Sequence, residues 1–261
     1  MINRFVGIDC GSTMCKTVLF DGEHIIDCHL TKTGWNPAGT ARESLSNLLT
    51  KHSLSQNDVR ICVTGYGREA VDFSDYTFTE ITCHALGALL LLPEIGGVID
   101  VGGQDSKVIQ VQGGKVVEFL MNDKCAAGTG RFLSMACDAL GIALEEIDGF
   151  ANPHEVISIT SMCTVFAESE IIGTLAMQKD RSKILSGVLL SIAQKILQMA
   201  GKLDFNKDKP LIMTGGLSRS TALVGVISKT IGIEVVTHEL AQFAGAVGAC
   251  ISAKAKEAQC G

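Results

Sequence analysis

The chain has 261 residues, and 46% of them are hydrophobic, which is enough to bury a core in one large domain or two smaller ones. A net charge of −6 without any basic run argues against a nucleic-acid binder, and the longest unbroken apolar stretch, Ala85 to Leu92, is far shorter than the roughly 20 residues that span a membrane. The first apolar run contains Asp9 and has no small-residue cleavage site, unlike a secretory signal, so we expect a soluble, cytoplasmic protein whose ten cysteines stay reduced.

Residues 4–20 form an apolar run, a glycine turn and a second apolar run, which predicts two strands joined by a tight loop. Residues 97–111 repeat this order of residue types. The corresponding residues are Ile8, Asp9, Gly11, Lys16 and Gly22 in the first segment and Ile99, Asp100, Gly102, Lys107 and Gly113 in the second. This match indicates an internal duplication, in which each half begins with a strand, a tight turn and another strand.

The elements between and after these segments follow from apolar periodicity. Helices are expected at 39–51, 81–92, 129–140, 182–203 and 240–256, and strands at 58–64, 210–214 and 233–237. The last helix is rich in Gly and Ala and should therefore pack closely against its neighbours. We expect a first lobe at 1–94, a second lobe at 95–240 and a C-terminal helix at 241–261 that packs back on the first lobe.

The duplicated segments predict a phosphate-binding site of an unusual kind. The sequence contains no GxxxxGK[ST] motif, which excludes a P-loop ATPase. Two strand–turn–strand loops can instead offer backbone N–H groups to a polyphosphate. Asp9 and Asp100 directly precede the two turns, where each could hold Mg²⁺ that bridges phosphate oxygens. A lysine that opens a strand often lies on a solvated edge, so Lys16 and Lys107 contribute least to this argument.

These motifs resemble those of the actin/Hsp70/sugar-kinase superfamily. GIDCGSTMCK resembles its first phosphate motif, VIDVGGQDSK the second and MTGGLSRS the adenosine motif. The resemblance implies an α/β fold of two duplicated, ribonuclease-H-like lobes with the nucleotide in the cleft. Catalytic roles would fall on Asp9, Glu80, Asp100 and Gln104, with Glu80 orienting the attacking water. Nucleotide contacts would come from Gly11, Ser12, Thr13, Lys16, Gly102, Gly103, Gln104, Asp105, Gly128, Thr129, Gly130, Gly215, Gly216 and Gln242.

Two of the cysteines stand apart from the rest. The sequence has no CxxC motif, which argues against a self-contained zinc or ferredoxin-like site. Cys125 lies near the start of the glycine-bearing segment KCAAGTGRFL, which leads into the helix at 129–140. Cys163 lies in SMCTVFAESEII, where another helix starts. A helix N-terminus favours thiolates and an anionic cluster, and a two-fold dimer would supply four such ligands. The remaining cysteines are expected to have no role in a site, namely Cys10, Cys15, Cys28, Cys62, Cys83, Cys137, Cys250 and Cys260.

The pattern closely resembles the activators of 2-hydroxyacyl-CoA dehydratases and the ATPase subunits of benzoyl-CoA reductase, which form the BadF/BadG/BcrA/BcrD ATPase family. CAAGTGRFL is the most specific motif, and the resemblance extends from Val6 to Ala249. It implies a homodimer that binds ATP, ADP and Mg²⁺ and holds one [4Fe–4S] cluster through Cys125 and Cys163 of both subunits. ATP would change the angle between the helices that leave the cluster. An electron from a ferredoxin or flavodoxin would then pass to a separate dehydratase or reductase chain.

Two alternatives stay open at this point. A small-molecule kinase of the N-acetylglucosamine type would share the fold and the phosphate motifs, with Asp105 or Asp123 as the general base and Cys125 incidental. An ATP sensor without a redox role would share them too. Both predict a colourless protein, and only the kinase predicts a phosphorylated product.

Overall fold

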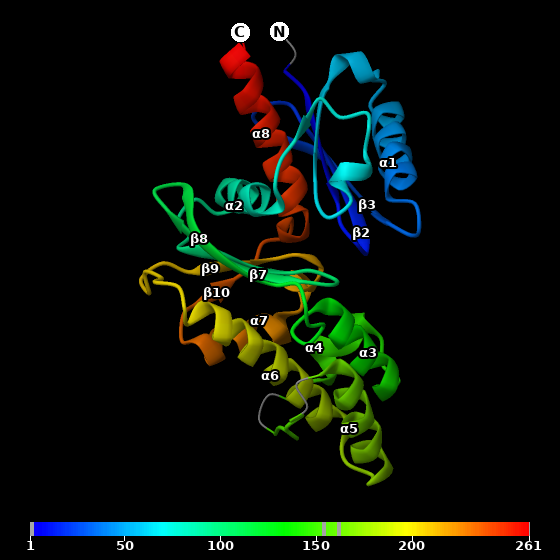
Figure 1. Cartoon of the computed structure of the whole chain (residues 1–261), viewed down its shortest axis with the longest axis vertical. Helices are drawn as coiled ribbons and strands as arrows, with labels where there is room; N and C mark the ends of the chain where they lie inside the picture. The colour runs from blue at the N-terminus through cyan, green and yellow to red at the C-terminus, as the bar shows by residue number, and fades with distance from the viewer. Residues whose placement is uncertain (1–2, 153–154, 161–162, 261) are drawn as a thin grey trace. The chain divides into compact units, whose positions relative to one another are not determined.

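The structure is a computed structural model that describes residues 3–152, 155–160 and 163–260 (Figure 1). The chain forms two compact units. The first consists of Met1–Glu94, Val111–Val116 and Leu240–Gly261, and the second of Ile95–Gln110 and Val117–Glu239.

The first unit is a five-stranded sheet with helices on both faces. Its strands lie in the order β3-β2-β1-β4-β5, and β1 pairs antiparallel with β2 and parallel with β4. The strands are β1 (Phe5–Cys10), β2 (Met14–Phe20), β3 (Ile25–Lys32), β4 (Arg60–Thr64) and β5 (Tyr76–Thr77). The helices are α1 (Pro37–Lys51), α2 (Glu80–Leu91) and α8 (Ala244–Cys260), with short 3-10 turns at Gln56–Asp58, Arg68–Ala70 and Ala241–Phe243.

Two apolar clusters hold these layers together. Leu45 and Leu48 of α1 pack on one face of the sheet, against side chains such as Ile8 of β1. Val247 and Cys250 of α8 pack on the other face, together with α2. The predicted close packing of the last helix is confirmed, because a Cβ atom at Gly248 would overlap the carbonyl group of Cys83 in α2.

The second unit repeats the sheet of the first. Its order, β10-β9-β6-β7-β8, is the same arrangement of antiparallel and parallel neighbours around the central strand β6, which confirms the duplication. The strands are β6 (Gly97–Val101), β7 (Ser106–Gln112), β8 (Lys115–Asn122), β9 (Leu211–Thr214) and β10 (Val235–Val236), and the turn that joins β7 to β8 belongs to Val111–Val116 of the first unit. The helices are α3 (Gly130–Leu140), α4 (Ile147–Phe150), α5 (Thr164–Ala176), α6 (Arg181–Ala200) and α7 (Thr221–Ile231), with 3-10 turns at Leu144–Glu146 and Gly216–Arg219.

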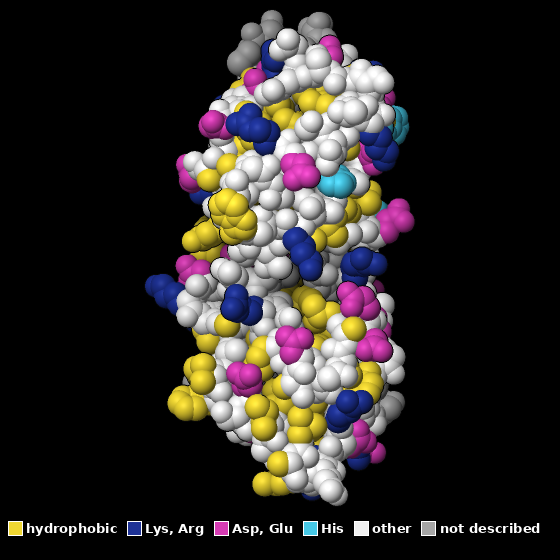
Figure 2. All heavy atoms as spheres, turned by 90° about the vertical axis from the view of Figure 1, so that its right-hand side faces the viewer, with side chains coloured by type: hydrophobic (Ala, Val, Ile, Leu, Met, Phe, Trp, Pro, Cys, Tyr) yellow, Lys and Arg dark blue, Asp and Glu magenta, His cyan; other side chains and the backbone are white. Residues whose placement is uncertain are grey.

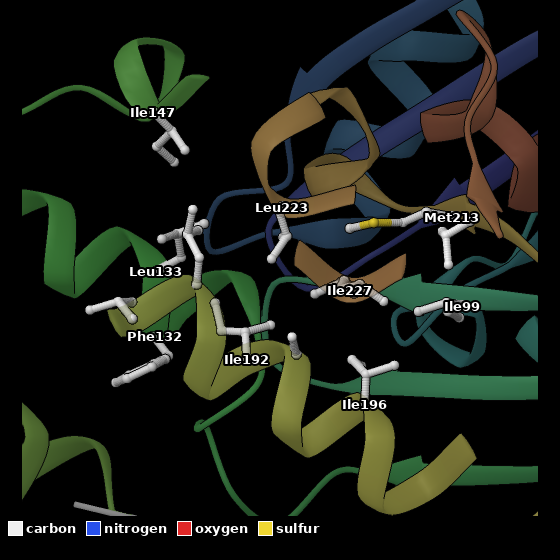
Figure 3. Close-up of a cluster of buried hydrophobic side chains, with 14 of the residues drawn as sticks. Ile99, Phe132, Leu133, Ile147, Ile192, Ile196, Met213, Leu223 and Ile227 are labelled. Carbon is white, nitrogen blue, oxygen red and sulfur yellow. The ribbon is translucent and has the colours of Figure 1, made fainter. Parts of the chain in front are cut away.

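The core of the second unit is built around α6. Figure 3 shows Ile192 and Ile196 of this helix directed toward apolar side chains of α3, α7 and the sheet, among them Phe132 and Ile227. Within the described part of the chain, α6 is the one helix long and apolar enough to cross a membrane. Most of its apolar side chains are buried in this core, as the 3.6-residue period predicts for a core helix, whereas Leu197 is exposed.

Candidate functional site

The first glycine loop joins β1 to β2 and is held by the loop that follows β3. The backbone N–H of Gly11 donates to the Met14 carbonyl (3.2 Å) and closes the turn around Ser12 and Thr13. The Thr33 hydroxyl donates to the Gly11 carbonyl (2.7 Å), and the Thr33 N–H donates to the Thr13 carbonyl (3.0 Å). The carbonyls of Gly11 and Thr13 therefore both accept hydrogen bonds from Thr33, and these bonds hold the loop in a defined shape.

Asp9 is the next-to-last residue of β1, close to this loop. It is 3% exposed, and its carboxylate pairs with Lys16 Nζ across the β1–β2 ladder at 2.9 Å. Two glycines leave room around the Asp9 carboxylate. A Cβ atom built on Gly65 would lie 2.6 Å from Asp9 Oδ1, and one built on Gly245 would lie 3.0 Å from Asp9 Oδ2. A buried carboxylate in an open cradle is a suitable oxygen ligand for Mg²⁺, so these residues fit the cation.

The second unit holds a matching group around Asp100. Lys107 Nζ lies 3.3 Å from the Asp100 carboxylate and 2.8 Å from the Asp105 carboxylate, and Lys107 is 3% exposed. The Thr214 hydroxyl also donates to Asp100 (3.1 Å). Gly215 leaves room on the other side, since a Cβ atom there would lie 2.7 Å from Asp100 Oδ1. Both aspartates thus combine burial, a lysine partner and a glycine with positive φ.

Neither lysine lies on a solvated strand edge. Their side chains are 13% exposed at Lys16 and 3% exposed at Lys107, and each points at the aspartate of its own unit. The spacing of seven residues between aspartate and lysine places them opposite each other across the hairpin, as the pairs Asp9↔Lys16 and Asp100↔Lys107 show. The lysines are therefore part of the two carboxylate groups.

The second glycine loop is bonded to the start of α3. The N–H of Gly130 donates to the Gly102 carbonyl (2.8 Å), and the N–H of Arg131 donates to the Gly103 carbonyl (2.9 Å). These two amides belong to the first turn of a helix, which has no partners for them within the helix. The loop at Gly102 and Gly103 therefore caps α3, while Gln104 is exposed at its tip.

Cys125 lies in the segment that connects β8 to α3. The Nδ2 atom of Asn122 donates to the carbonyls of Cys125 (2.8 Å) and Ala127 (3.0 Å), and this fixes the bend of the segment. Gly128 completes the bend with a φ of +90° that favours glycine, and Thr129 is the N-cap of α3. Cys125 itself is half-buried. Asn122 was not predicted as part of this segment.

Cys163 is exposed and is the N-cap residue of α5. Its side chain makes no capping hydrogen bond, and the buried hydroxyl of Thr164 beside it has no hydrogen-bond partner in the described residues. Helices α3 and α5 pack against each other. A thiol at the positive end of a helix, next to an orphaned donor, fits an anionic iron–sulfur group. Ser161 and Met162 of the same motif lie outside the described residues.

No group of three or more His, Cys, Asp and Glu that could hold a metal ion occurs among the residues the structure describes. Two cysteine ligands from one chain would therefore need two more from elsewhere. Among the other cysteines in the described residues, Cys10, Cys15, Cys62, Cys83, Cys137 and Cys250 are buried, and Cys28 lies half-buried on β3 of the first unit. Burial also raises the pKa of the Cys28 and Cys137 thiols to about 11.

The remaining predicted residues lie at element boundaries. In the first unit, Glu80 is the first residue of α2 and Gln242 lies in the 3-10 turn before α8, and both are half-buried. In the second unit, Gly215 follows β9 with a φ of +83°, and Gly216 begins the next 3-10 turn. The sheet of the second unit thus places Gly215 beside Asp100. In the first unit, Gln242 lies shortly before Gly245, the glycine that faces Asp9.

Comparisons with known proteins agree with these features. The model of the BadF/BadG/BcrA/BcrD ATPase family matches residues 6–253. The (R)-2-hydroxyglutaryl-CoA dehydratase activating ATPase of Acidaminococcus fermentans is 38% identical over 97% of this chain and 98% of its own length. The activator of the 2-hydroxyisocaproyl-CoA dehydratase from Clostridium difficile, solved with bound ADPNP, is similar with a TM-score of 0.91 and 35% identity, covering 98% of this chain and 97% of that one.

A more distant likeness concerns the fold alone. A ROK family protein from Streptococcus pneumoniae, solved with sucrose, has a TM-score of 0.53 at 15% identity, with 98% of this chain and 99% of that one covered. Together with the duplicated sheets, these neighbours confirm the actin/Hsp70/sugar-kinase fold expected from the three motifs.

Proposed function

The chain belongs to the BadF/BadG/BcrA/BcrD ATPase family, and from this we propose that it is an ATP-hydrolysing, one-electron donor that activates a separate acyl-CoA enzyme. The electron would come from a [4Fe–4S] cluster that two identical subunits share. The partner would be a 2-hydroxyacyl-CoA dehydratase or a related acyl-CoA reductase, because relatives of the chain are named as activators of such dehydratases.

The nucleotide half of the proposal rests on the two carboxylate groups. Asp9 and Asp100 are buried, each has a lysine partner, and each lies close to a glycine loop. We assign them to Mg²⁺, with Glu80 and Gln104 as further catalytic residues. The phosphates would bind Gly11, Ser12, Thr13, Lys16, Gly102, Gly103, Gln104, Asp105, Gly128, Thr129 and Gly130, and the adenosine would bind Gly215, Gly216 and Gln242.

The redox half rests on Cys125 and Cys163. Each precedes the first turn of a helix, α3 or α5, and these two helices pack against each other. The positive ends of the helices favour thiolates. When bound, a cluster supplies a single low-potential electron, and this chain's residues would hold it and set its access to a partner.

The apolar surface of α5 supports a homodimer. Val165, Phe166 and Ile172 are 67%, 69% and 53% exposed, whereas Ala167 and Ile171 on the opposite side of the helix are buried. Figure 2 shows exposed hydrophobic side chains at the end of the second unit where α5 lies. A second copy that covers this surface would bring its own Cys125 and Cys163 and complete four thiolate ligands.

One observation carries the coupling of the two halves: the two hydrogen bonds between the second glycine loop and α3. Gly102 and Gly103 are predicted phosphate ligands, and α3 is the helix that Cys125 precedes. A ligand shifts a conformational equilibrium only through different affinities for the two states. A loop that moves with the phosphates would therefore move α3 and with it the segment of Cys125.

A ferredoxin or flavodoxin as the reductant and a location in the cytoplasm belong to the same proposal. A low-potential cluster would need a low-potential electron carrier of this kind as its donor. Cysteines that stay reduced would be kept so by the reducing conditions of the cytoplasm.

The test is an oxygen-free purification with measurement of iron, acid-labile sulfide and the visible spectrum. We expect about four irons per dimer and a brown protein, with loss of both in Cys125→Ser and in Cys163→Ser. Cys28→Ser is the matched control and should keep the cluster, because Cys28 is a half-buried thiol on β3. A colourless, iron-free dimer that hydrolyses ATP even after cluster reconstitution would favour the kinase or the sensor instead.

A further inference from the structure

Helices α2 and α8 cross so closely that glycines are required at their contacts. A Cβ atom at Gly87 of α2 would overlap the Ala244 carbonyl oxygen, and one at Gly248 of α8 would overlap the Cys83 carbonyl. Backbone therefore packs directly on backbone along this crossing. The crossing fixes the position of the side chains beside it, including those that face Asp9.

His84 is a side chain of α2 that this crossing places near Asp9. The imidazole is buried, with 4% exposure. A Cβ atom built on Gly245 of α8 would lie 2.9 Å from His84 Nε2 and 3.0 Å from Asp9 Oδ2. His84 Nε2 and Asp9 Oδ2 thus both lie beside Gly245, and a residue with a side chain at this position would press against both atoms.

Glu80 lies one helical turn before His84 on α2. Residues four apart share a face of a helix, so both side chains lie on the side of α2 that faces Asp9. The proposed catalytic residue Glu80 and the unassigned His84 therefore belong to one polar surface. Lys16 approaches the same Oδ2 atom of Asp9 at 2.9 Å.

We propose that His84 is a positioning residue for Asp9: a water that bonds both His84 Nε2 and Asp9 Oδ2 fixes the orientation of the carboxylate. The inference rests on the proposed function, in which Asp9 binds Mg²⁺ with the nucleotide. Carboxylates that bind metal ions are in turn held by hydrogen bonds, and loss of such an outer partner typically costs about 10- to 100-fold in metal affinity or activity. A water between two polar groups is nearly as favourable as a direct bond.

The test compares His84→Leu, His84→Gln and Cys83→Ala. Leucine removes the polar atom, and glutamine retains an amide that can hold the water. Cys83→Ala is the matched control, because Cys83 is the buried neighbour of His84 and faces α8. The readout is equilibrium binding of a non-hydrolysable ATP analogue at increasing Mg²⁺ concentrations, followed by the fluorescence of Trp35. This single tryptophan is 94% exposed, and it follows Thr33, which is bonded to the first glycine loop.

We expect His84→Leu to raise the half-saturating Mg²⁺ concentration by about 10-fold or more, with unchanged nucleotide binding in the absence of Mg²⁺. His84→Gln should restore most of the loss, and Cys83→Ala should show no shift. An unchanged Mg²⁺ requirement in His84→Leu, or an equal shift in all three variants, would overturn the proposal. A wild-type protein that binds no nucleotide would contradict the proposed function itself, so the two failures are distinguishable.

Discussion

Lys107 is the residue whose removal should destabilise the second unit most directly. It is 3% exposed and lies between the carboxylates of Asp100 and Asp105. In Lys107→Met, the two carboxylates would lose the cation that they share. Removing one partner of a buried ion pair lowers the free energy of unfolding by about 3–5 kcal/mol. Lys16→Met should cost less, because the Lys16 side chain is more exposed, at 13%. Urea unfolding at pH 7 measures both free energies.

A double variant separates charge from packing at this site. Asp100→Asn in the Lys107→Met background removes the uncompensated charge, so it should recover part of the lost free energy. If Asp100→Asn instead adds its own full cost to that of Lys107→Met, the two residues are not coupled and the ion pair contributes little.

The sequence predicts the aspartates more readily than their partners. Asp9 and Asp100 stand in repeated segments, where equal spacing indicates equal roles. His84 and Asn122 lie outside these segments, and their contacts depend on how helices and loops cross. His84 lies near Asp9, beside Gly245, because α2 and α8 are in backbone contact, which no local pattern around His84 indicates. Lys107 appears as a strand opening in the sequence, whereas in the structure it is buried opposite Asp100 on β6 and pairs with the carboxylates of Asp100 and Asp105.

At the scale of elements, the glycines of α8 should differ sharply in what they tolerate. In Gly245→Ala the new Cβ would meet the side-chain ends of His84 and Asp9, which can shift. In Gly248→Ala it would meet the backbone of α2 at Cys83, which cannot move without separating the helices. We expect Gly245→Ala to remain folded with lower ATP hydrolysis, and Gly248→Ala to be the less stable protein by about 1–3 kcal/mol, the typical cost of overpacking a core.

Thermal unfolding and an ATPase assay on the two variants test this difference. Equal stability of both would mean that the crossing of α2 and α8 is looser than the structure indicates. Full activity of Gly245→Ala would show that the space beside Asp9 is not needed.

Asp148 holds the N-terminus of α7 and should make the second unit sensitive to acid. Burial raises the pKa of its carboxyl group, but hydrogen bonds from Ser220, Thr221 and the Ala222 N–H outweigh this and lower the pKa below its ordinary value of 3.8. A lowered carboxyl pKa stabilises the fold above the unfolded-state value, and this stabilisation is lost as the pH falls through the folded-state pKa. Asp148→Ala should therefore cost about 1 kcal/mol at pH 7.

The cost of Asp148→Ala should shrink as the pH falls below about 4, because the wild-type carboxylate is then progressively protonated. Denaturant unfolding at pH 7 and pH 3 measures this dependence. Asp138→Ala, at an exposed position of α3, is the control and should change stability little at either pH. A cost that is independent of pH would contradict the role of the charged carboxylate.

Element boundaries show where local sequence is insufficient. The helix expected at 182–203 is found at Arg181–Ala200, because an unbroken apolar face defines it. The strand expected at 233–237 is reduced to Val235–Val236, since only these residues find partners on β9. Helix α7, with Gly225 in its middle, and the edge strands β3 and β8 were not predicted. Helix α7 is stabilised by Asp148 and by packing on α6, which are tertiary interactions.

At the scale of the whole molecule, duplication explains why one short sequence yields two similar carboxylate groups. The same strand order around β1 and β6 places Asp9 and Asp100 at equivalent strand ends, and Thr64 and Thr214 at equivalent neighbouring positions. The halves then differ in their additions. The second unit carries α3 and α5 with the two candidate cluster ligands, so the redox function would be an insertion into one copy of a repeated ATP-binding unit.

The apolar surface of α5 gives the last prediction. If this surface is the dimer interface, Phe166→Glu should place a charge where 69% of the side chain is now exposed and shift the protein from dimer to monomer. Glu168→Gln on the same helix is the matched control and should leave the dimer intact. The oligomeric state is measured by light scattering under anaerobic conditions, together with iron content.

A monomeric Phe166→Glu protein should also lose its iron, because Cys125 and Cys163 of one chain are half of the proposed ligands, while Asp9 and its surroundings in the first unit stay unchanged. ATP binding by the monomer should therefore persist. A dimer that survives Phe166→Glu and Ile172→Glu would place the subunit contact elsewhere. A monomer that retains about four irons would show that the cluster ligands come from a single chain and would overturn the shared-cluster proposal.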